Sequence, residues 1–212
     1  MAMVAHRKII VASLAGLAML TGIPAAAQVY SEGYEFLKAV KDRDGTTATE
    51  MLRKPGTTVV NARDVSSGET GLHLVTRQRN VTWIRFLSQE GANPNIADKN
   101  GVTPLILATQ IGFVEGAEAL IAAGAQVDVA NSAGETPLIT AVHNRNLELI
   151  EVFLKAGADP DRTDNSGRSA RAYVEQRNVD PRVLSTFAEH APKPDGDPDG
   201  DRASGGLYGP AF

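Results

Sequence analysis

The sequence predicts an all-α solenoid, in which helix–turn–helix units joined by hairpin-like loops are stacked side by side. Two short motifs recur along the chain with the same constant step. One is a helix start, found at Thr70, Thr103, Thr136 and Ser169. The other is a glycine-led loop, found at Gly91, Gly124 and Gly157. A unit of this length cannot cover its own apolar face, so two motifs that share one period indicate units that bury those faces against each other.

The residue types in the motifs explain why each unit contains helices. In Thr103-Pro104 and Thr136-Pro137, the threonine can accept a hydrogen bond from an unpaired amide at a helix start. Proline suits the first helical position, because it has no amide hydrogen and its φ is already helical. The glycine after a second helix can adopt a positive φ and end that helix. These roles are structural, and the motifs carry no catalytic chemistry.

Both motifs, and the step at which they recur, resemble those of the ankyrin-repeat family, and the resemblance extends over about residues 31–190. It implies an ankyrin-repeat domain over residues 28–190, with terminal repeats that are modified because one side of each faces water. We place the N-terminal cap at about 31–66, the regular repeats at 67–99, 100–132 and 133–165, and the C-terminal cap at 166–190. Within the regular repeats we expect helix pairs at 70–75 and 81–88, 103–110 and 114–122, and 136–143 and 147–155.

The N-terminal segment, residues 1–27, predicts export. A short basic start over residues 6–8 precedes an apolar run over residues 9–20, and three alanines at 25–27 supply the small side chains that a signal peptidase reads. We expect cleavage between Ala27 and Gln28, with the mature protein periplasmic or secreted and not inserted in a membrane. The alternative is an uncleaved anchor, although the apolar run is shorter than the roughly 20 residues that span a bilayer comfortably.

One position in the second helices predicts how neighbouring units pack. Trp83, Gly116 and Leu149 are each one period apart and so occupy the same level of successive second helices. The only tryptophan would then lie beside the smallest residue, a volume compensation that close packing favours. We predict that Trp83 is a core residue beside Gly116, and that Gly116→Leu is strongly destabilising.

The two ends of the domain depart from the repeat pattern. Residues 31–56 keep two apolar segments but lack the Thr-Pro-Leu helix start. At the other end, Asp180-Pro181 is typical of a helix start and predicts a last helix over residues 182–190. We interpret both segments as capping repeats.

The C-terminal segment, residues 191–212, is rich in proline and glycine, and we predict a disordered acidic tail. Its acidic run over residues 195–201 matches the first half of a calcium-binding loop. The twelfth loop position is Gly206 instead of the glutamate that binds calcium through both oxygens, so we favour a solvated tail over a calcium site.

Composition and motifs exclude several functions. The chain has no cysteine, which rules out disulfides, thiolate nucleophiles and cysteine-based zinc sites. Removal of residues 1–27 takes away two basic residues and no acid, so the net charge falls from −4 to −6 and opposes binding to nucleic acid. No nucleophile elbow, phosphate-binding glycine loop or paired-histidine helix motif occurs. We therefore expect no enzymatic activity, no cofactor and no metal.

His73 occupies the histidine position of the family's Thr-Pro-Leu-His motif. The resemblance implies that it donates a hydrogen bond to loop backbone, and nothing in the sequence supplies the partners that an acid–base role would need. Ile106 and Ile139 stand at the equivalent positions of the next two repeats, so other groups must support the loops there.

The resemblance also implies where a partner binds, namely on the concave surface formed by the hairpin tips and the exposed positions of the first helices. Carried over position by position, the candidate residues are Arg77, Gln78, Arg79, Lys99, Asn100, Gln110, Ile111, Ser132, His143, Asn144, Arg145 and Arg177. Arg79 and Arg145 stand where the family expects glycine.

Four of these residues would form a basic stripe in an acidic protein, with Lys41 and Arg43 added from the cap; they are Arg77, Arg79, Arg145 and Arg177. Arginine binds carboxylates through two parallel hydrogen bonds and is enriched at interface hot spots, so the stripe predicts an acidic protein partner. The alternative is that these arginines are only solvated charges.

We therefore expect a monomeric, non-enzymatic scaffold of the cell envelope that binds a protein partner through its concave surface. The small exported bacterial ankyrin proteins that this chain resembles suggest an alternative. In that alternative the protein is an accessory, immunity or inhibitor protein that acts on a periplasmic enzyme such as a catalase or a toxin.

Overall fold

The computed structural model describes residues 25–175 and 180–191, and the regular secondary structure within them is helical. The helices are α1 (Ala25–Asp42), α2 (Gly45–Leu52), the short 3-10 helix η1 (Val59–Asn61), α3 (Gly71–Arg77), α4 (Val81–Gln89), α5 (Pro104–Gln110), α6 (Val114–Ala122), α7 (Pro137–His143), α8 (Leu147–Lys155), α9 (Ala170–Val174) and α10 (Pro181–His190). The predicted all-α repeat fold is confirmed, and the helices expected in the regular repeats and in the C-terminal cap begin and end close to their predicted positions.

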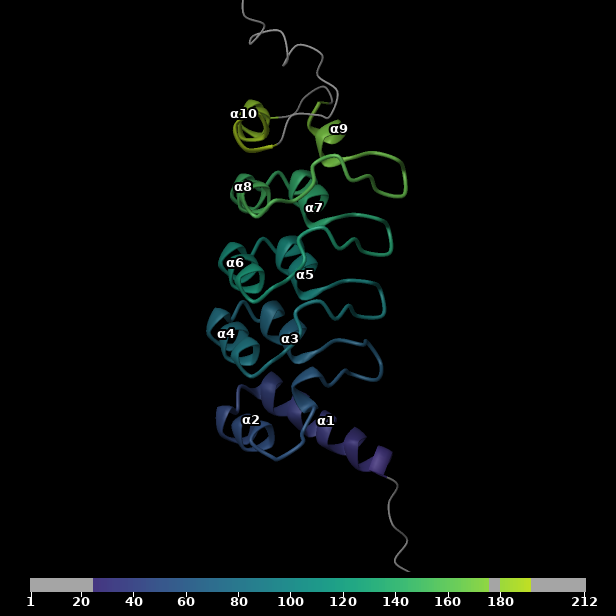
Figure 1. Cartoon of the computed structure of the whole chain (residues 1–212), viewed down its shortest axis with the longest axis vertical. Coiled ribbons are helices and arrows are strands. Elements are labelled where there is room, and N and C mark those ends of the chain that lie inside the picture. The colour runs from purple at the N-terminus through teal and green to yellow at the C-terminus, as the bar shows by residue number, and fades with distance from the viewer. Residues whose placement is uncertain (1–24, 176–179, 192–212) are drawn as a thin grey trace, which may run out of the picture.

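The helices form two columns with a row of hairpins along one side (Figure 1). Helices α1, α3, α5, α7 and α9 form the inner column, next to the hairpins, and α2, α4, α6, α8 and α10 form the outer column. Each helix packs on its partner in the same repeat, and the inner helices from α1 to α9 and the outer helices from α4 to α10 also pack on the equivalent helix of the next repeat. The fold is therefore an elongated stack in which contacts are made only between neighbouring units.

Local capping bonds begin the inner helices where the sequence places them. The hydroxyls of Thr103, Thr136 and Ser169 accept hydrogen bonds from the backbone amides three residues further on, at 3.2–3.3 Å. Such a cap satisfies an amide that has no partner inside the helix and contributes about 1 kcal/mol. Because this bond is local, the start of each inner helix can be predicted from the sequence alone.

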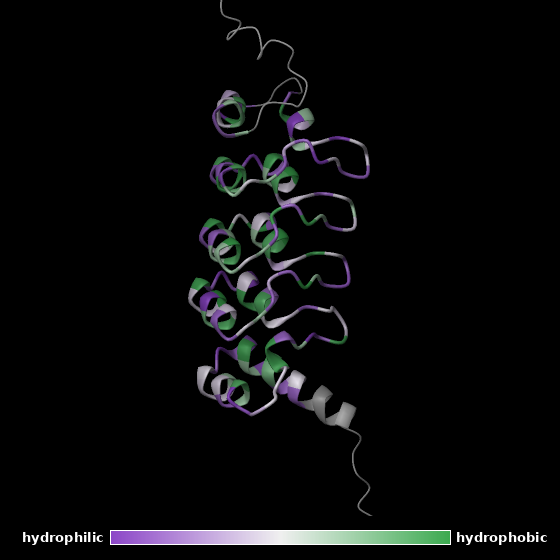
Figure 2. Ribbon diagram, in the orientation of Figure 1, coloured by the Kyte–Doolittle hydropathy of each residue, from purple (hydrophilic) through white to green (hydrophobic). Residues whose placement is uncertain are grey.

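The core lies between the two columns of helices, where Figure 2 shows apolar segments facing one another. The same levels of the stack are filled in successive repeats, by Leu72, Leu105 and Leu138 in the inner column and by Leu87, Leu120 and Phe153 in the outer column. Each of these side chains is at most 1% exposed. Burial of one such side chain contributes about 1.5–3 kcal/mol, so stacking supplies most of the stability of the solenoid.

The predicted packing of Trp83 beside Gly116 is wrong. Trp83 is only partly buried, and its ring lies edge-to-face against Phe86 with 5.4 Å between the ring centroids. The atoms nearest to Gly116 belong to Phe113, whose ring would lie 2.2 Å from a β-carbon built on that glycine. The volume compensation is thus made within one repeat, between Phe113 and Gly116, and not between neighbouring second helices.

Phe113 differs from its equivalents because it precedes α6 without capping it. In the neighbouring repeats, Asn80 and Asn146 accept hydrogen bonds at the starts of α4 and α8, from the amides of Trp83 and Leu149. Phe113 has no side-chain atom that can accept such a bond, and its ring instead covers Gly116 in the first turn of α6. A large residue at the cap therefore requires a small one in the first turn of the helix.

A left-handed backbone conformation recurs just after the inner helices. Gly112 has a φ of 61°, and Arg79 and Arg145 both have a φ of 53° at the equivalent positions. Arg43 in the N-terminal cap, with a φ of 60°, repeats the same conformation. A left-handed conformation costs a residue with a side chain about 1–2 kcal/mol, so these three arginines are locally strained.

Helices α10 and α1 lie at the two ends of the stack. Asp180 caps α10 by accepting a hydrogen bond from the Arg182 amide at 2.9 Å, and α10 packs on α8. At the other end α1 packs on α3, and Phe36 of α1 is fully buried. No helix in the described ranges is both long and apolar enough to cross a membrane.

Several sequence-based expectations lie outside the described residues. These are the signal segment up to residue 24, the site residue Arg177, and the tail from residue 192 with its calcium-like run over 195–201. The predicted cleavage site between Ala27 and Gln28 lies in the first turn of α1.

Candidate partner-binding surface

The last residues of the inner helices form one row along the predicted concave surface. Arg77, Gln110 and His143 end α3, α5 and α7, and all three side chains are exposed. Because they occupy the same position of successive repeats, they lie one repeat apart on a rigid framework. The structure therefore brings these three predicted residues together on one side of the stack.

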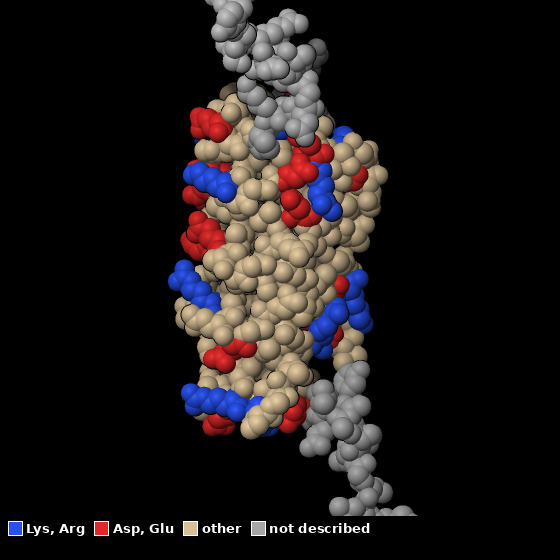
Figure 3. Space-filling view, in the orientation of Figure 1, with Lys and Arg blue, Asp and Glu red and all other residues tan. Residues whose placement is uncertain are grey.

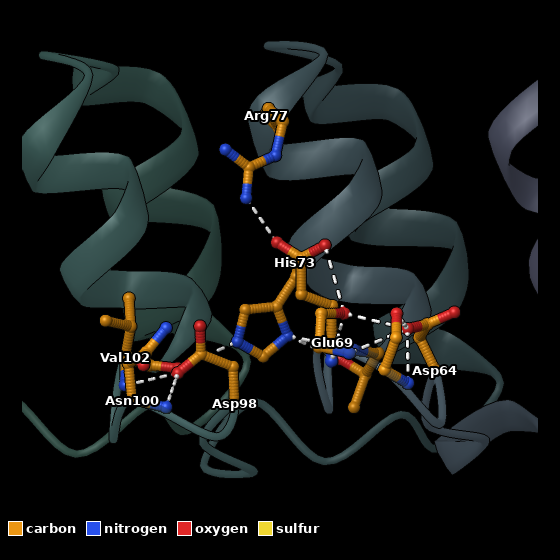
Figure 4. Close-up of polar contacts among 10 residues, drawn as sticks. Asp64, Glu69, His73, Arg77, Asp98, Asn100 and Val102 are labelled. Atoms are coloured by element: carbon orange, nitrogen blue, oxygen red, sulfur yellow. Dashed lines mark hydrogen bonds and ion pairs between the residues drawn. The ribbon is translucent and has the colours of Figure 1, made fainter.

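Two members of this row already have partners within the protein. Arg77 forms an ion pair with Glu69, which lies below it at the base of the hairpin (Figure 4). The His143 ring lies 3.4 Å from a Glu135 oxygen and edge-to-face against Tyr173. The Gln110 side chain makes no hydrogen bond with the part of the chain that the structure describes. A partner at this row would therefore meet one free amide group between two side chains that are held in place.

The second row, which follows the first by one residue, links neighbouring repeats. The Gln78 amide group donates to the Lys41 carbonyl at 2.8 Å and accepts from the Arg43 side chain at 2.9 Å. The Asn144 amide group donates to the Thr109 carbonyl at 3.3 Å. Gln78 and Asn144 were predicted to bind a partner, and the structure gives each of them a role in joining repeats. Ile111, the third member, is half-buried.

The third row follows the second by one residue, and its two arginines, Arg79 and Arg145, make different contacts. Arg79 donates to the carbonyls of Ile111 and Gly112 at 2.7 and 3.1 Å, and its guanidinium lies over the Phe113 ring at 5.0 Å from the centroid. These contacts tie the end of α3 to the end of α5 in the next repeat. The Arg145 side chain, on a backbone of the same conformation, forms no hydrogen bond or ion pair with any described residue.

The positive charge of Arg145 has only a small effect on the pKa of Asp180. The pKa of Asp180 is lowered mainly by its bonds to Arg182, and to a smaller extent by the positive charge of Arg145. Since Asp180 is already paired with Arg182 at 2.8 Å, it does not occupy the Arg145 guanidinium.

The basic stripe that the sequence predicts is therefore not a uniform row of free cations. Arg79 stabilises the stack, Arg77 is paired with an acid, and the Arg145 side chain is unpaired within the described residues. On the face that Figure 3 shows, acidic and basic groups lie mainly along the two sides and towards the ends of the stack, and much of the middle of that face carries no charge.

His73 has the structural role that the family resemblance implies. Its ring is fully buried, with Nδ1 accepting from the Thr70 amide at 3.1 Å and Nε2 lying 2.9 Å from the Val102 carbonyl, to which it donates (Figure 4). Burial lowers the pKa of His73, because a charged ring would lose its hydration. A neutral, buried ring with both nitrogens bonded links two repeats and has no exposed atom for catalysis.

A ladder of side-chain caps supports all four hairpins, including the two next to which isoleucine replaces this histidine. One oxygen of Asp98 accepts from two backbone amides of its own hairpin at 2.8 and 2.9 Å, and Asn131 does the same at 2.9 and 3.0 Å. Asp64 and Asp164 repeat the arrangement in the first and last hairpins. Bonds from Ser66 and Ser67 lower the pKa of Asp64 to about 2. The recurrence of Asp or Asn at these positions was visible in the sequence and was missed.

The hairpin tips are joined to one another through their backbones. The amide of Lys99 donates to the Ser67 carbonyl at 2.9 Å, and the amide of Ser132 donates to the Asn100 carbonyl at 3.4 Å. The Lys99 ammonium group also donates to the Val65 carbonyl at 2.7 Å. The predicted tip residues Lys99, Asn100 and Ser132 therefore lie on a continuous edge, with the side chains of Asn100 and Ser132 exposed.

A cluster of titratable groups covers the C-terminal half of this surface. The Tyr173 hydroxyl donates to Asp164 at 2.6 Å, and the Arg168 guanidinium lies over the Tyr173 ring at 4.7 Å from its centroid. Ser166 and Tyr173 together lower the pKa of Asp164. His143 joins the cluster through its contact with Tyr173, although the sequence had left it without a partner. Among the described residues, no three acids and histidines are arranged to hold a metal ion.

Comparison with known proteins decides the family. A family model for "Ankyrin repeats (3 copies)" matches residues 36–131 and 72–164, more than half of the chain. The chain belongs to the ankyrin-repeat family. Human 2-5A-dependent ribonuclease is 31% identical over 84 residues, a stretch that covers 40% of this chain and 11% of that enzyme. The chain thus spans a small part of that relative, and the similarity lies in ankyrin repeats.

Family membership sets the general function. Ankyrin repeats are scaffolds for protein–protein interaction, and the family is not in general catalytic. In this chain, the side chains of the concave surface that have no structural role are the ones available to a partner.

Proposed function

We propose that this ankyrin protein is a monomeric, non-enzymatic scaffold of the cell envelope that holds an acidic protein partner on its concave surface. The observation that carries the proposal is the contrast between Arg79 and Arg145. Both adopt the same strained conformation, and Arg79 makes contacts that offset the strain, whereas the Arg145 side chain makes no such bond with the residues that the structure describes. The Arg145 side chain is exposed, without a hydrogen-bond or ion-pair partner in the described part of the chain, and can bind a carboxylate.

Arg77, two repeats nearer the N-terminus, supports the same proposal. Its ion pair with Glu69 is formed by one guanidinium nitrogen, which leaves the other donors of the fork to bind a second carboxylate. Gln110, exposed between Arg77 and His143, can donate to or accept from a partner. The partner that fits this arrangement has carboxylates spaced along one face to match successive repeats.

Affinity capture tests the proposal. Tagged wild-type protein is incubated with an envelope extract of its host, and bound proteins are identified by mass spectrometry. We expect one stoichiometric, acidic partner, and we expect Arg77→Gln/Arg145→Gln to weaken its binding at least about tenfold, or about 1.4 kcal/mol. We substitute glutamine and not glutamate, because an acid at position 77 would repel Glu69 and lower stability. A loss of binding could then not be distinguished from a loss of stability.

The matched control removes two arginines from the outer column. Arg53 follows α2 and Arg85 lies in α4, and both side chains are exposed. Arg53→Gln/Arg85→Gln changes the net charge by the same amount without touching the concave surface. Equal binding by both double variants and the wild type would refute the proposal, and so would turnover of a small molecule by the pure protein.

Export is the second part of the proposal, and the layered N-terminal sequence supports it. The protein is expressed with its own residues 1–27 in place, and the N-terminus of the mature form is sequenced from each cell fraction. We expect a soluble envelope form that begins at Gln28. A form that still begins at Met1, or one that stays with the membrane, would contradict the expected cleavage.

A further inference from the structure

Backbone hydrogen bonds join each hairpin to the one before it and so form a ladder along the stack. The first hairpin leaves one step of this hairpin ladder unfilled. In three successive hairpins, the residue after the capping Asp or Asn donates its backbone amide to the hairpin before it. These donors are Lys99 to Ser67 at 2.9 Å, Ser132 to Asn100 at 3.4 Å, and Asn165 to Ala133 at 3.1 Å. The equivalent residue of the first hairpin is Val65, which follows Asp64. Its amide has no acceptor in the described part of the chain.

A cleft of about 630 Å³ lies in front of this open step. Its walls come from α1, from the segment around η1 and from the first hairpin, and they include Tyr34, Leu37, Val59 and Val65. Tyr34 is 64% exposed and Val65 is 69% exposed, and only Leu184 is a third exposed large hydrophobic residue in the described chain. Two such side chains on the walls of one cleft are typical of an interaction site.

A second hollow of about 480 Å³ continues the cleft along α1 and shares Tyr34, Leu37, Asp64 and Ser66 with it. This part is lined by the exposed side chains of Lys38 and Lys41, neither of which forms an ion pair with the described residues. One turn of α1 thus presents two free ammonium groups next to the apolar walls.

The acids around this hollow form no ion pair with the two lysines. Asp64 accepts bonds from its own hairpin, and Glu69 is paired with Arg77. Asp42 alone is an exposed acid without a partner among the described residues that line the hollow. Arg63 donates to the Ala97 and Gly68 carbonyls and supports the first hairpin. The hollow carries no net positive charge, but its two ammonium groups have no ion-pair partner among the described residues and are free to pair with a carboxylate of a bound segment.

We propose that this cleft binds an extended acidic peptide segment of the partner protein. A carbonyl of the segment accepts the Val65 amide hydrogen and so fills the open step, an apolar side chain packs between Tyr34 and Val65, and a neighbouring carboxylate pairs with Lys38 or Lys41. Addition of an extended segment to an unpaired backbone edge is a general mode of peptide recognition. The proposal rests on the proposed scaffold function and specifies the chemistry of the partner.

The shape of this end favours a narrow peptide over a second copy of the solenoid. Helix α1 extends past the first hairpin on the hairpin side of the stack (Figure 1). The 15 residues of α1 that remain after the proposed cleavage, from Gln28 to Asp42, make a rod about 22 Å long, which would lie in the way of another repeat stacked against this end. An extended segment is thin enough to lie between α1 and the hairpin.

A random-peptide display library, selected on the full chain, tests the proposal. We expect enriched sequences with an aliphatic or aromatic residue next to Asp or Glu. Binding of a selected peptide, measured by fluorescence polarisation, should fall at least about tenfold in Tyr34→Ala/Val65→Ser and in Lys38→Gln/Lys41→Gln. Leu184→Ser removes the third exposed hydrophobic residue, at the opposite end of the stack, and should leave binding unchanged.

A measurement on the Val65 amide distinguishes a backbone hydrogen bond to the peptide from apolar contact alone. Hydrogen exchange of the Val65 amide, followed by NMR, should slow at least about tenfold when the selected peptide is bound. Unchanged exchange at saturating peptide would overturn the proposal. Because the substituted side chains are exposed, circular dichroism melting should be the same in all variants and exclude unfolding as the cause of lost binding.

Other occupants give distinct results that also overturn the proposal. Concentration-dependent oligomers that disappear in Tyr34→Ala/Val65→Ser would show a second copy. Tight binding of a peptide with the sequence of residues 195–208, in competition with the selected peptides, would assign the cleft to this chain's own acidic segment. Capture of the natural partner that depends on Arg77 and Arg145 but not on the cleft would refute the cleft site and leave the scaffold function intact.

Discussion

Gly116 offers the sharpest test of the packing, because a β-carbon there would lie 2.2 and 2.3 Å from two atoms of the Phe113 ring. Carbon atoms cannot approach this closely, so in Gly116→Leu the ring must move. The ring has no free space to enter, since Phe113 is only 4% exposed and lies under the Arg79 guanidinium. Overpacking of this kind costs about 1–3 kcal/mol, partly offset by a helix propensity gain of up to about 1 kcal/mol. We expect Gly116→Leu to lower the free energy of unfolding by about 2 kcal/mol.

The structure also predicts which second change restores stability. Phe113→Asn alone loses a buried ring, at about 3 kcal/mol, and gains a helix cap of about 1 kcal/mol, for a net loss of about 2 kcal/mol. Phe113→Asn/Gly116→Leu recreates the Asn146 and Leu149 pair of the next repeat, in which the asparagine accepts from the leucine amide at 3.1 Å. We expect this double variant to lie within about 1 kcal/mol of the wild type, although the single losses add up to about 4 kcal/mol.

Urea unfolding followed by far-UV circular dichroism measures all three variants, and equal slopes against urea concentration would validate the comparison. The matched control is Glu118→Leu, which adds the same side chain to an exposed position of α6 and should change stability by less than about 0.5 kcal/mol. Additive losses in the double variant would refute the reasoning, because they would show that Phe113 and Gly116 do not compensate each other.

Three further predictions concern the links between repeats. Arg145→Gly should raise the free energy of unfolding in urea by about 0.5–1 kcal/mol, because it relieves left-handed strain and loses no hydrogen bond or ion pair of the side chain with the described residues. Arg79→Gly should lower the free energy of unfolding by about 1 kcal/mol, because its bonds to the next repeat are lost. Equal effects of the two substitutions would contradict the assigned roles. The pKa of buried His73 is lower in the folded protein than in the unfolded chain, so the unfolded chain binds more protons and stability falls as the pH drops below about 6.5. His73→Gln should flatten stability against pH between 7 and 5, and an unchanged slope would argue against this origin. Asn95 accepts from the Gln126 amide at 2.8 Å and donates to the Gly124 carbonyl at 3.0 Å, so Asn95→Ala should cost about 1–2 kcal/mol in the same assay, and no loss would show that these bonds do not join the repeats.

Much of the fold could be predicted because its signals are local and repeated. The caps at Thr103 and Thr136 and the prolines that follow them act within one helical turn, so the starts of α5 and α7 follow from a few adjacent residues. The constant step between the motifs then implies stacking, since every unit exposes the same apolar face until a neighbour covers it. The missed Asp and Asn caps of the hairpins are also local, and their spacing would have revealed them.

The binding surface could be predicted only as a set of positions. Alignment by repeat placed Arg79 and Arg145 in one row, and both do share a backbone conformation. Their contacts differ, because Arg79 faces Phe113 and two carbonyls of the next repeat, whereas the Arg145 side chain has no hydrogen-bond or ion-pair partner among the described residues. The cleft beside Tyr34 and Val65 was not predicted at all, since it depends on how α1 crosses the first hairpin.

The sequence by itself therefore determined the repeat, the helix boundaries and the family, because each follows from short-range hydrogen bonds and from a period that can be counted. Only the tertiary structure decided which arginines are used inside the stack, why Gly116 must be small, and where an unpaired backbone amide meets an open cleft. These features depend on side-chain packing and on contacts between neighbouring repeats, such as that of Arg79 with Ile111, and residue spacing alone does not specify such contacts.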